Sequence, residues 1–145
     1  MDIIEFLKNN MDSIIISILG FMSFLTVALS IERTIFYTRI NLSLYEDKDE
    51  CEEALTKNLT LLYIIYQNAP YIGLLGTVAG IMVTFYDMGA NGNIDSFSIM
   101  IGLSLALKAT ALGLIVAIPT LVLYNLFIRK VDTLLNKFTK ISRQK

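Results

Sequence analysis

The chain has 145 residues, 54% of them hydrophobic, with a formal net charge of −1, one cysteine and no histidine. A soluble domain of this size disperses its apolar residues, whereas here they form long blocks that are almost free of charge. The composition therefore excludes an ordinary soluble domain, and without a basic arm it predicts no nucleic-acid partner.

The first predicted transmembrane span covers about residues 12–31. Residues 13–31 carry no charge, and roughly 20 apolar residues cross the core of a bilayer as a helix. A cleaved signal peptide is the alternative, because Ala28-Leu29-Ser30 has the small-x-small spacing of a cleavage site. The leading charges, at Asp2, Glu5 and Lys8, do not form a basic region, and the apolar block is longer than that of a signal. We therefore predict a membrane anchor.

A loop of about residues 32–69 follows. Within it, residues 45–57 are charged and are predicted to form a turn and then a helix with solvated faces. Pro70 marks the point where the chain enters the membrane for a second span at about 70–88.

The stretch from Met88 to Asp95, with two glycines and two asparagines, predicts a short turn. Asp95, Ser96 or Ser98 is expected to cap the third helix. This helix spans the membrane over about 97–128 and continues as an amphipathic helix into a tail of about 129–145. The sequence thus predicts an all-α membrane protein with three transmembrane helices, forming one domain over 1–145.

The basic residues are distributed unevenly around the spans. Four lysines and arginines lie between the first and second spans and six follow the third, whereas only Lys8 precedes the first span and the turn at 88–95 has none. Cytoplasmic segments carry the excess of positive charge. We therefore predict an external (periplasmic) N-terminus, with the loop, the tail and their helical extensions in the cytoplasm.

The inventory of reactive side chains is poor. There is no histidine, Cys51 is alone, and no Asp or Glu lies within the apolar blocks of residues 13–31, 58–86 and 96–128. Catalytic dyads and metal sites need such groups. We therefore predict that the chain is not an enzyme and holds no metal or other cofactor.

Two stripes of small and polar residues run along the second and third spans. One contains Gly73, Thr77, Gly80 and Thr84, with Gly76 and Gly80 forming a GxxxG pair. The other contains Ala106, Thr110, Gly113 and Ala117. Steps of four, three and four place each stripe on one helical face. The spacing alone indicates close helix packing; the alternative is that Thr77 and Thr110 line a polar path.

The segments APYIGLLGTVAGIMVTF (69–85) and LALKATALGLIVAIPTLVLYN (105–125) resemble the second and third membrane helices of the ExbB/TolQ/MotA family. SIERTIFY (30–37) resembles the first helix more loosely. The ExbB branch is the nearer resemblance. A MotA-like protein would be expected to have four spans and a large cytoplasmic domain, which the sequence does not predict. A TolQ-like role in envelope integrity and a passive membrane scaffold remain the alternatives.

The resemblance implies a multi-pass subunit of the bacterial inner membrane, assembled as a homo-oligomer, a pentamer in ExbB. It implies that the ring encloses an ExbD-like protein with an intramembrane aspartate and acts on a TonB-like protein to energise transport across the outer membrane. The family's two pore-facing threonines correspond to Thr77 and Thr110. Better-known ExbB sequences carry a glutamate at the position of Leu105, so its role cannot be transferred.

Lys108 is the one charge in the third apolar block. A cation in a membrane span costs roughly 2.5–3.5 kcal/mol on insertion scales. Lys108 lies two residues from Thr110, about 200° around the helix, and so points away from the threonine stripe. We predict that it meets an acid or a carbonyl cluster at an interface between helices. The alternatives are that its stem extends toward a polar edge of the membrane and that the lysine is merely tolerated.

Overall fold

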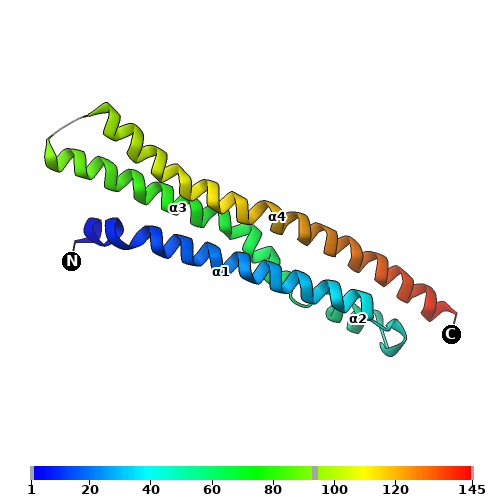
Figure 1. The fold of residues 1–145 in the computed structure, drawn as a ribbon. Coiled ribbons are helices and arrows are strands. Elements are labelled where there is room, and N and C mark those ends of the chain that lie inside the picture. Colours follow the sequence, from blue (N-terminus) through cyan, green and yellow to red (C-terminus); the bar gives the residue numbers. More distant parts are fainter. Residues whose placement is uncertain (1, 93–94, 145) are drawn as a thin grey trace.

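A computed structural model describes residues 2–92 and 95–144. The described chain consists of α1 (Ile3–Arg39), the 3-10 turn η1 (Leu42–Leu44), α2 (Lys48–Thr56), α3 (Leu59–Asn91) and α4 (Ser96–Arg143). Figure 1 shows an elongated bundle with the two ends of the chain at opposite ends. The three long helices are each long and apolar enough to cross a membrane. The described residues contain no strand, so the predicted all-α membrane architecture is confirmed.

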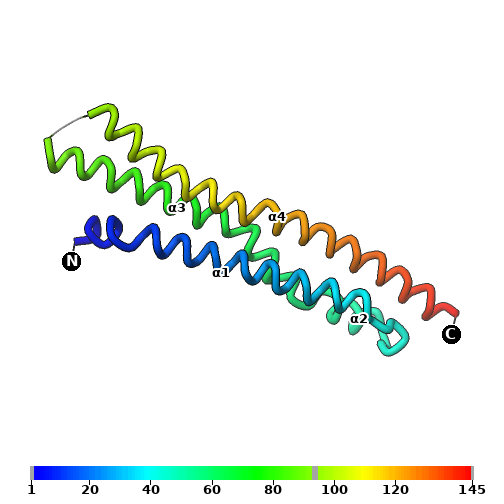
Figure 2. The backbone as a smooth tube through the Cα atoms, viewed as in Figure 1, coloured from blue at the N-terminus to red at the C-terminus, as the bar shows by residue number. Residues whose placement is uncertain are grey.

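α3 and α4 form an antiparallel hairpin, which has the most extensive contact in the molecule, and α1 packs along it (Figure 2). Gly92 follows α3 with φ +65°, in the left-handed region that ends helices. The carboxylate of Asp95 accepts a 3.2 Å hydrogen bond from the Phe97 N–H, so Asp95 is the cap of α4. Residues 93 and 94 of the predicted turn lie outside the described residues.

The helices extend well beyond the spans predicted from hydropathy. α3 begins at Leu59 and continues through Pro70, which lies inside it. α4 runs without interruption to Arg143. The amphipathic extension predicted for α4 is confirmed, because Val131, Leu134 and Phe138 are buried.

The prediction of a solvated helix in the charged loop is wrong for one face of α2. Its acidic side chains are exposed, but Cys51 and Leu55 have no exposed surface. They belong to a core cluster at the C-terminal end of the bundle. The two apolar residues are four positions apart among charged ones, so they share one face of the helix, and this face is buried. The cluster also contains Tyr37, Leu42, Leu59, Leu62, Phe127, Val131, Leu134, Leu135 and Phe138.

Arg33 attaches α2 to the end of α1. Its side chain is 1% exposed; Nη1 donates to the carbonyl oxygens of Ala54 (3.0 Å) and Leu55 (3.4 Å), and the Tyr37 hydroxyl also donates to Leu55 (2.7 Å). These are carbonyls of the last turn of α2, which have no partner within the helix. Glu32 accepts from Nε and Nη2 of Arg33, both at 2.6 Å. The loop is thereby held against the bundle.

Cys51 is a free cysteine with no exposed surface. Burial, and secondarily the neighbouring charge of Glu50, raises the pKa of its thiol. Because the thiolate is the reactive form, Cys51 is expected to react slowly with thiol reagents at neutral pH. Labelling of this loop therefore requires an introduced cysteine at an exposed position.

Candidate functional site

The small residues of the two stripes form the contact surface between α3 and α4. An added Cβ at Gly73 would lie 2.6 Å from the Ala109 carbonyl oxygen, and one at Gly113 would lie 2.6 Å from that of Ala69. At Gly80 it would lie 2.7 Å from Cβ of Ala106. The two backbones therefore approach too closely for any larger residue at these positions. We call this contact surface the seam.

The other two predicted packing residues also lie in the interior. A Cβ at Gly76 would lie 2.6 Å from Cβ of Ala109 and 3.4 Å from Ile15 of α1, so Gly76 stands where the three long helices meet. Ala117 is buried in the same cluster as Ile15 and Ala109. Small residues thus allow α1 as well as α4 to approach α3 closely.

Thr77 and Thr110 meet within the seam. Oγ1 of Thr77 donates to the Ala106 carbonyl oxygen at 2.9 Å and lies 2.5 Å from Oγ1 of Thr110. A hydroxyl carries one proton, so when Thr77 donates to the carbonyl, Thr110 must be the donor between the two hydroxyls. Thr110 then keeps a free acceptor position.

The two hydroxyls differ in access. Thr77 is 7% exposed, whereas Thr110 is half-buried at the edge of the seam. Of the two hydroxyls, that of Thr110 is therefore the one that a group outside the protomer can reach. The free lone pair there suits a hydrogen-bond donor such as a protonated carboxyl group. In the described residues no Asp or Glu forms a hydrogen bond with either threonine.

A second threonine pair was not predicted from the sequence. Thr26 of α1 and Thr120 of α4 are buried, with their hydroxyl oxygens 3.0 Å apart. Each hydroxyl also lies within hydrogen-bonding distance of its own i−4 carbonyl, that of Met22 (3.0 Å) or Val116 (2.8 Å). No periodic pattern joins the two residues, since they are 94 positions apart, so only the packing reveals the pair.

A narrow cavity of about 140 Å³ approaches the seam between α1 and the hairpin. Asp12 of α1 lines it together with Gly76, Gly80 and Ala106. Leu105, the position at which the sequence resemblance expects a glutamate, lines it as well. Helix packing therefore places Asp12, which lies at the N-terminal edge of the first predicted span, beside small residues of the seam.

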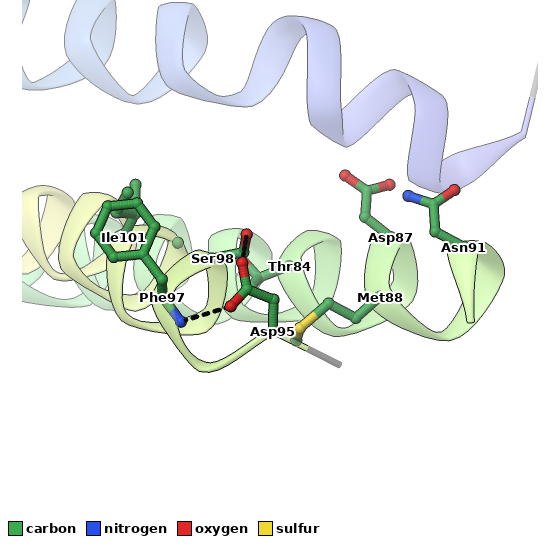
Figure 3. Close-up of a pocket in the computed structure, with 9 residues that line it drawn as sticks. Thr84, Asp87, Met88, Asn91, Asp95, Phe97, Ser98 and Ile101 are labelled. Atoms are coloured by element: carbon green, nitrogen blue, oxygen red, sulfur yellow. Dashed lines mark hydrogen bonds between the residues drawn. The ribbon is translucent and has the colours of Figure 1, made fainter. Parts of the chain in front are cut away.

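A larger cavity of about 420 Å³ lies at the tip of the hairpin (Figure 3). It shares Thr84 and Gly102 with the narrow cavity. Asp87 and Asn91 of α3 point toward α1 here, and Asp87 forms a 3.2 Å ion pair with Lys8. The ion pair is solvent-exposed and therefore contributes little stability. It places charged groups where the larger cavity adjoins the narrow one.

Lys108 lies on the exposed surface of α4, away from the seam. Within the described ranges, it forms neither an ion pair nor a hydrogen bond with another side chain. The expectation that Lys108 meets an acid or a carbonyl cluster stays a prediction.

Comparison with known proteins places the chain in a family. Residues 19–140 match the MotA/TolQ/ExbB proton channel family. The chain is 58% identical over 132 residues to "Biopolymer transport protein ExbB" of Helicobacter pylori, covering 91% of each protein. It is 48% identical over 127 residues to the protein of that name from Aquifex aeolicus, covering 88% of this chain and 86% of the relative.

A relative from a different branch matches over a shorter region. "Tol-Pal system protein TolQ" of Pseudomonas aeruginosa is 36% identical over 87 residues, which is 60% of this chain and 38% of the relative. The two ExbB proteins from Helicobacter pylori and Aquifex aeolicus are thus matched over more of both chains and at higher identity. The chain belongs to the MotA/TolQ/ExbB proton channel family.

Proposed function

We propose that the chain forms the ring of an ExbB-like energiser in the inner membrane and that Thr77 and Thr110 serve its proton path. Its ExbB-like role in the TonB system and its multi-pass membrane location follow from the relatives and the three apolar helices. The observation that supports the proton path is the hydroxyl pair in the seam, where Thr110 keeps an acceptor position at the edge.

A titratable group must carry the proton, and we propose that a second protein supplies it. Threonine hydroxyls do not titrate in the physiological range. Asp12 lies at the edge of the first predicted span and outside its uncharged block, so we propose that the carrier is the intramembrane aspartate of an ExbD-like partner. That partner and a homopentameric ring are both implied by the family resemblance, and a TonB-like protein receives the resulting motion. Transport of one charge supplies about 2.3 kcal/mol per 100 mV, which suits conformational work rather than catalysis.

The predicted orientation is part of this proposal, since the excess of basic residues lies in the loop and the tail. A cysteine at Asn91 should react with an impermeant maleimide in intact cells. One at exposed Asp49, in a Cys51→Ala background, should react only after the inner membrane is permeabilised. Labelling in the reverse order would contradict the orientation.

Uptake through a TonB-dependent receptor tests the energiser role. In cells that lack the chain, expression of the parental protein with its ExbD-like partner should restore uptake, and the partner with aspartate replaced by asparagine should not. A passive scaffold would not distinguish the two partners. A TolQ-like role would instead restore envelope integrity without restoring uptake.

A further inference from the structure

Two charged residues at the level of the seam have no partner within the protomer. In the part of the chain that the structure describes, ion pairs join Lys8 to Asp87 and Arg33 to Glu32, and neither involves Asp12 or Lys108. Asp12 and Lys108 are both exposed. A charge without a partner is costly in apolar surroundings, so each is expected to meet an opposite charge in the assembled protein.

The register between α1 and α4 places the two charges at almost the same level. Thr26 contacts Thr120, and Ile15 and Ala109 meet at Gly76. Both contacts join residues that are 94 positions apart, so the two helices run in the same direction without a shift. Asp12 is therefore level with Ala106, and Lys108 lies two residues further, about 3 Å along the axis at 1.5 Å per residue.

The other carboxylates near this end of the bundle lie too far from Lys108 along the bundle axis to pair with it. Gly80 packs on Ala106 and Thr84 on Gly102, so Asp87 of α3 is level with residue 99 of α4. Glu5 of α1 is level with the same residue by the α1 register. Both are nine residues from Lys108, or about 13 Å, which exceeds the reach of a lysine side chain. Asp12 is the acid of this chain that matches Lys108 in level.

Asp12 and Lys108 cannot meet within one protomer, because α1, which carries Asp12, packs on the side of α4 that faces away from Lys108. Ala106, Ala109 and Gly113 of α4 are buried against the other helices, whereas Lys108 and its neighbours Leu107 and Ala111 face outward. In a ring whose axis is normal to the membrane, every copy keeps its residues at the same level. The outward face of α4 can then contact the α1 side of the next copy.

We propose that Lys108 of one subunit pairs with Asp12 of the neighbouring subunit. The inference rests on the homo-oligomer in the proposed function and names one contact within it. The pair joins two different surfaces, which is the head-to-tail contact that closes into rings. It explains how the chain retains a lysine in an apolar helix: the charge sets the axial register between neighbours.

Disulfide cross-linking tests the contact directly. In a Cys51→Ala background, Asp12→Cys with Lys108→Cys should give, on mild oxidation, a ladder of covalent oligomers on non-reducing gels. Both new residues are neutral, so the double variant leaves no charge unpaired. Glu5→Cys with Lys108→Cys is the matched control, because Glu5 lies on the same helix about 13 Å away in level, and it should remain monomeric.

Charge exchange tests the electrostatic part. Lys108→Asp alone and Asp12→Lys alone should each lower the yield of assembled ring about tenfold or more, because like charges then face each other. The double exchange should restore the ring toward the parental yield. Without the ladder and without this restoration the proposal is wrong, and it is equally wrong if Lys108→Cys cross-links to the ExbD-like partner instead.

These outcomes are separable from a failure of the proposed function. Uptake supported by the parental chain reports the function alone, whatever the cross-links show. A ladder from a chain that does not support uptake would keep the Asp12–Lys108 contact and overturn the energiser role. Parental uptake with neither the ladder nor the restoration by charge exchange would keep the energiser role and overturn the Asp12–Lys108 contact.

Discussion

Replacing Thr77 and Thr110 together by valine should abolish partner-dependent uptake while the complex remains in the membrane at its parental level. Valine keeps the shape of threonine and removes both hydroxyls, so the seam stays filled. The lost hydrogen bonds cost stability of about 1 kcal/mol each, which is small for a helix pair packed along its length. The expected loss is therefore one of proton transfer.

The two single variants, Thr77→Val and Thr110→Val, should reduce uptake to different extents. When Thr77 is valine, the Thr110 hydroxyl can donate to the Ala106 carbonyl, its own i−4 carbonyl, and still offers an acceptor at the seam edge. When Thr110 is valine, the accessible hydroxyl is gone and only the enclosed Thr77 remains. Thr110→Val should accordingly reduce uptake more than Thr77→Val.

The second threonine pair supplies the matched control. Thr26→Val with Thr120→Val also removes two buried hydroxyls that contact each other, but between α1 and α4. This variant should lose a comparable amount of thermal stability and keep its uptake. Normal uptake in the Thr77/Thr110 double variant, or an equal loss in both double variants, would assign Thr77 and Thr110 to packing alone.

Gly73→Ala should disrupt the hairpin, whereas Gly20→Ala should be harmless. A Cβ at Gly73 would lie 2.6 Å from the Ala109 carbonyl oxygen and 3.1 Å from Cα of Thr110, so backbone must move. A Cβ at Gly20 meets nothing within 4 Å, and alanine favours a helix over glycine by about 1 kcal/mol. The two substitutions therefore add the same methyl group with opposite expected effects.

Thermal unfolding in detergent and the yield of assembled complex measure this difference. Overpacking of a close contact costs about 1–3 kcal/mol, so Gly73→Ala should unfold at a lower temperature and separate the Thr77–Thr110 contact. Gly20→Ala should unfold at or above the parental temperature. Equal unfolding temperatures for the two variants would show that the seam yields easily and that its close approach is not required.

The sequence predicted the helices and the composition of the seam because both follow from local patterns. Long uncharged blocks identify membrane helices, and the spacing of Gly73, Thr77 and Gly80 identifies one face of α3. The match between that face and Ala106, Thr110 and Gly113 of α4 follows from the short connection that makes the two helices antiparallel neighbours.

Features that depend on the placement of α1 could not be predicted in this way. Thr26 belongs to a helix whose rotation and axial position are set by contacts about 94 residues away, so its pairing with Thr120 leaves no periodic signal. The same register places Asp12 beside Gly80, although hydropathy assigns it to the edge of a span. The sequence identifies Arg33 only as a cytoplasmic charge, because its structural role depends on the carbonyls of α2.

Proton flux through the reconstituted complex tests the central claim most directly. Liposomes containing the chain and its ExbD-like partner are energised by a potassium gradient with valinomycin, and a pH-sensitive dye reports proton entry. Flux should require the partner's intramembrane aspartate and should be lost with asparagine there or with valine at both Thr77 and Thr110. Flux that persists in both variants would contradict a path formed by the threonine pair and the partner's carboxylate.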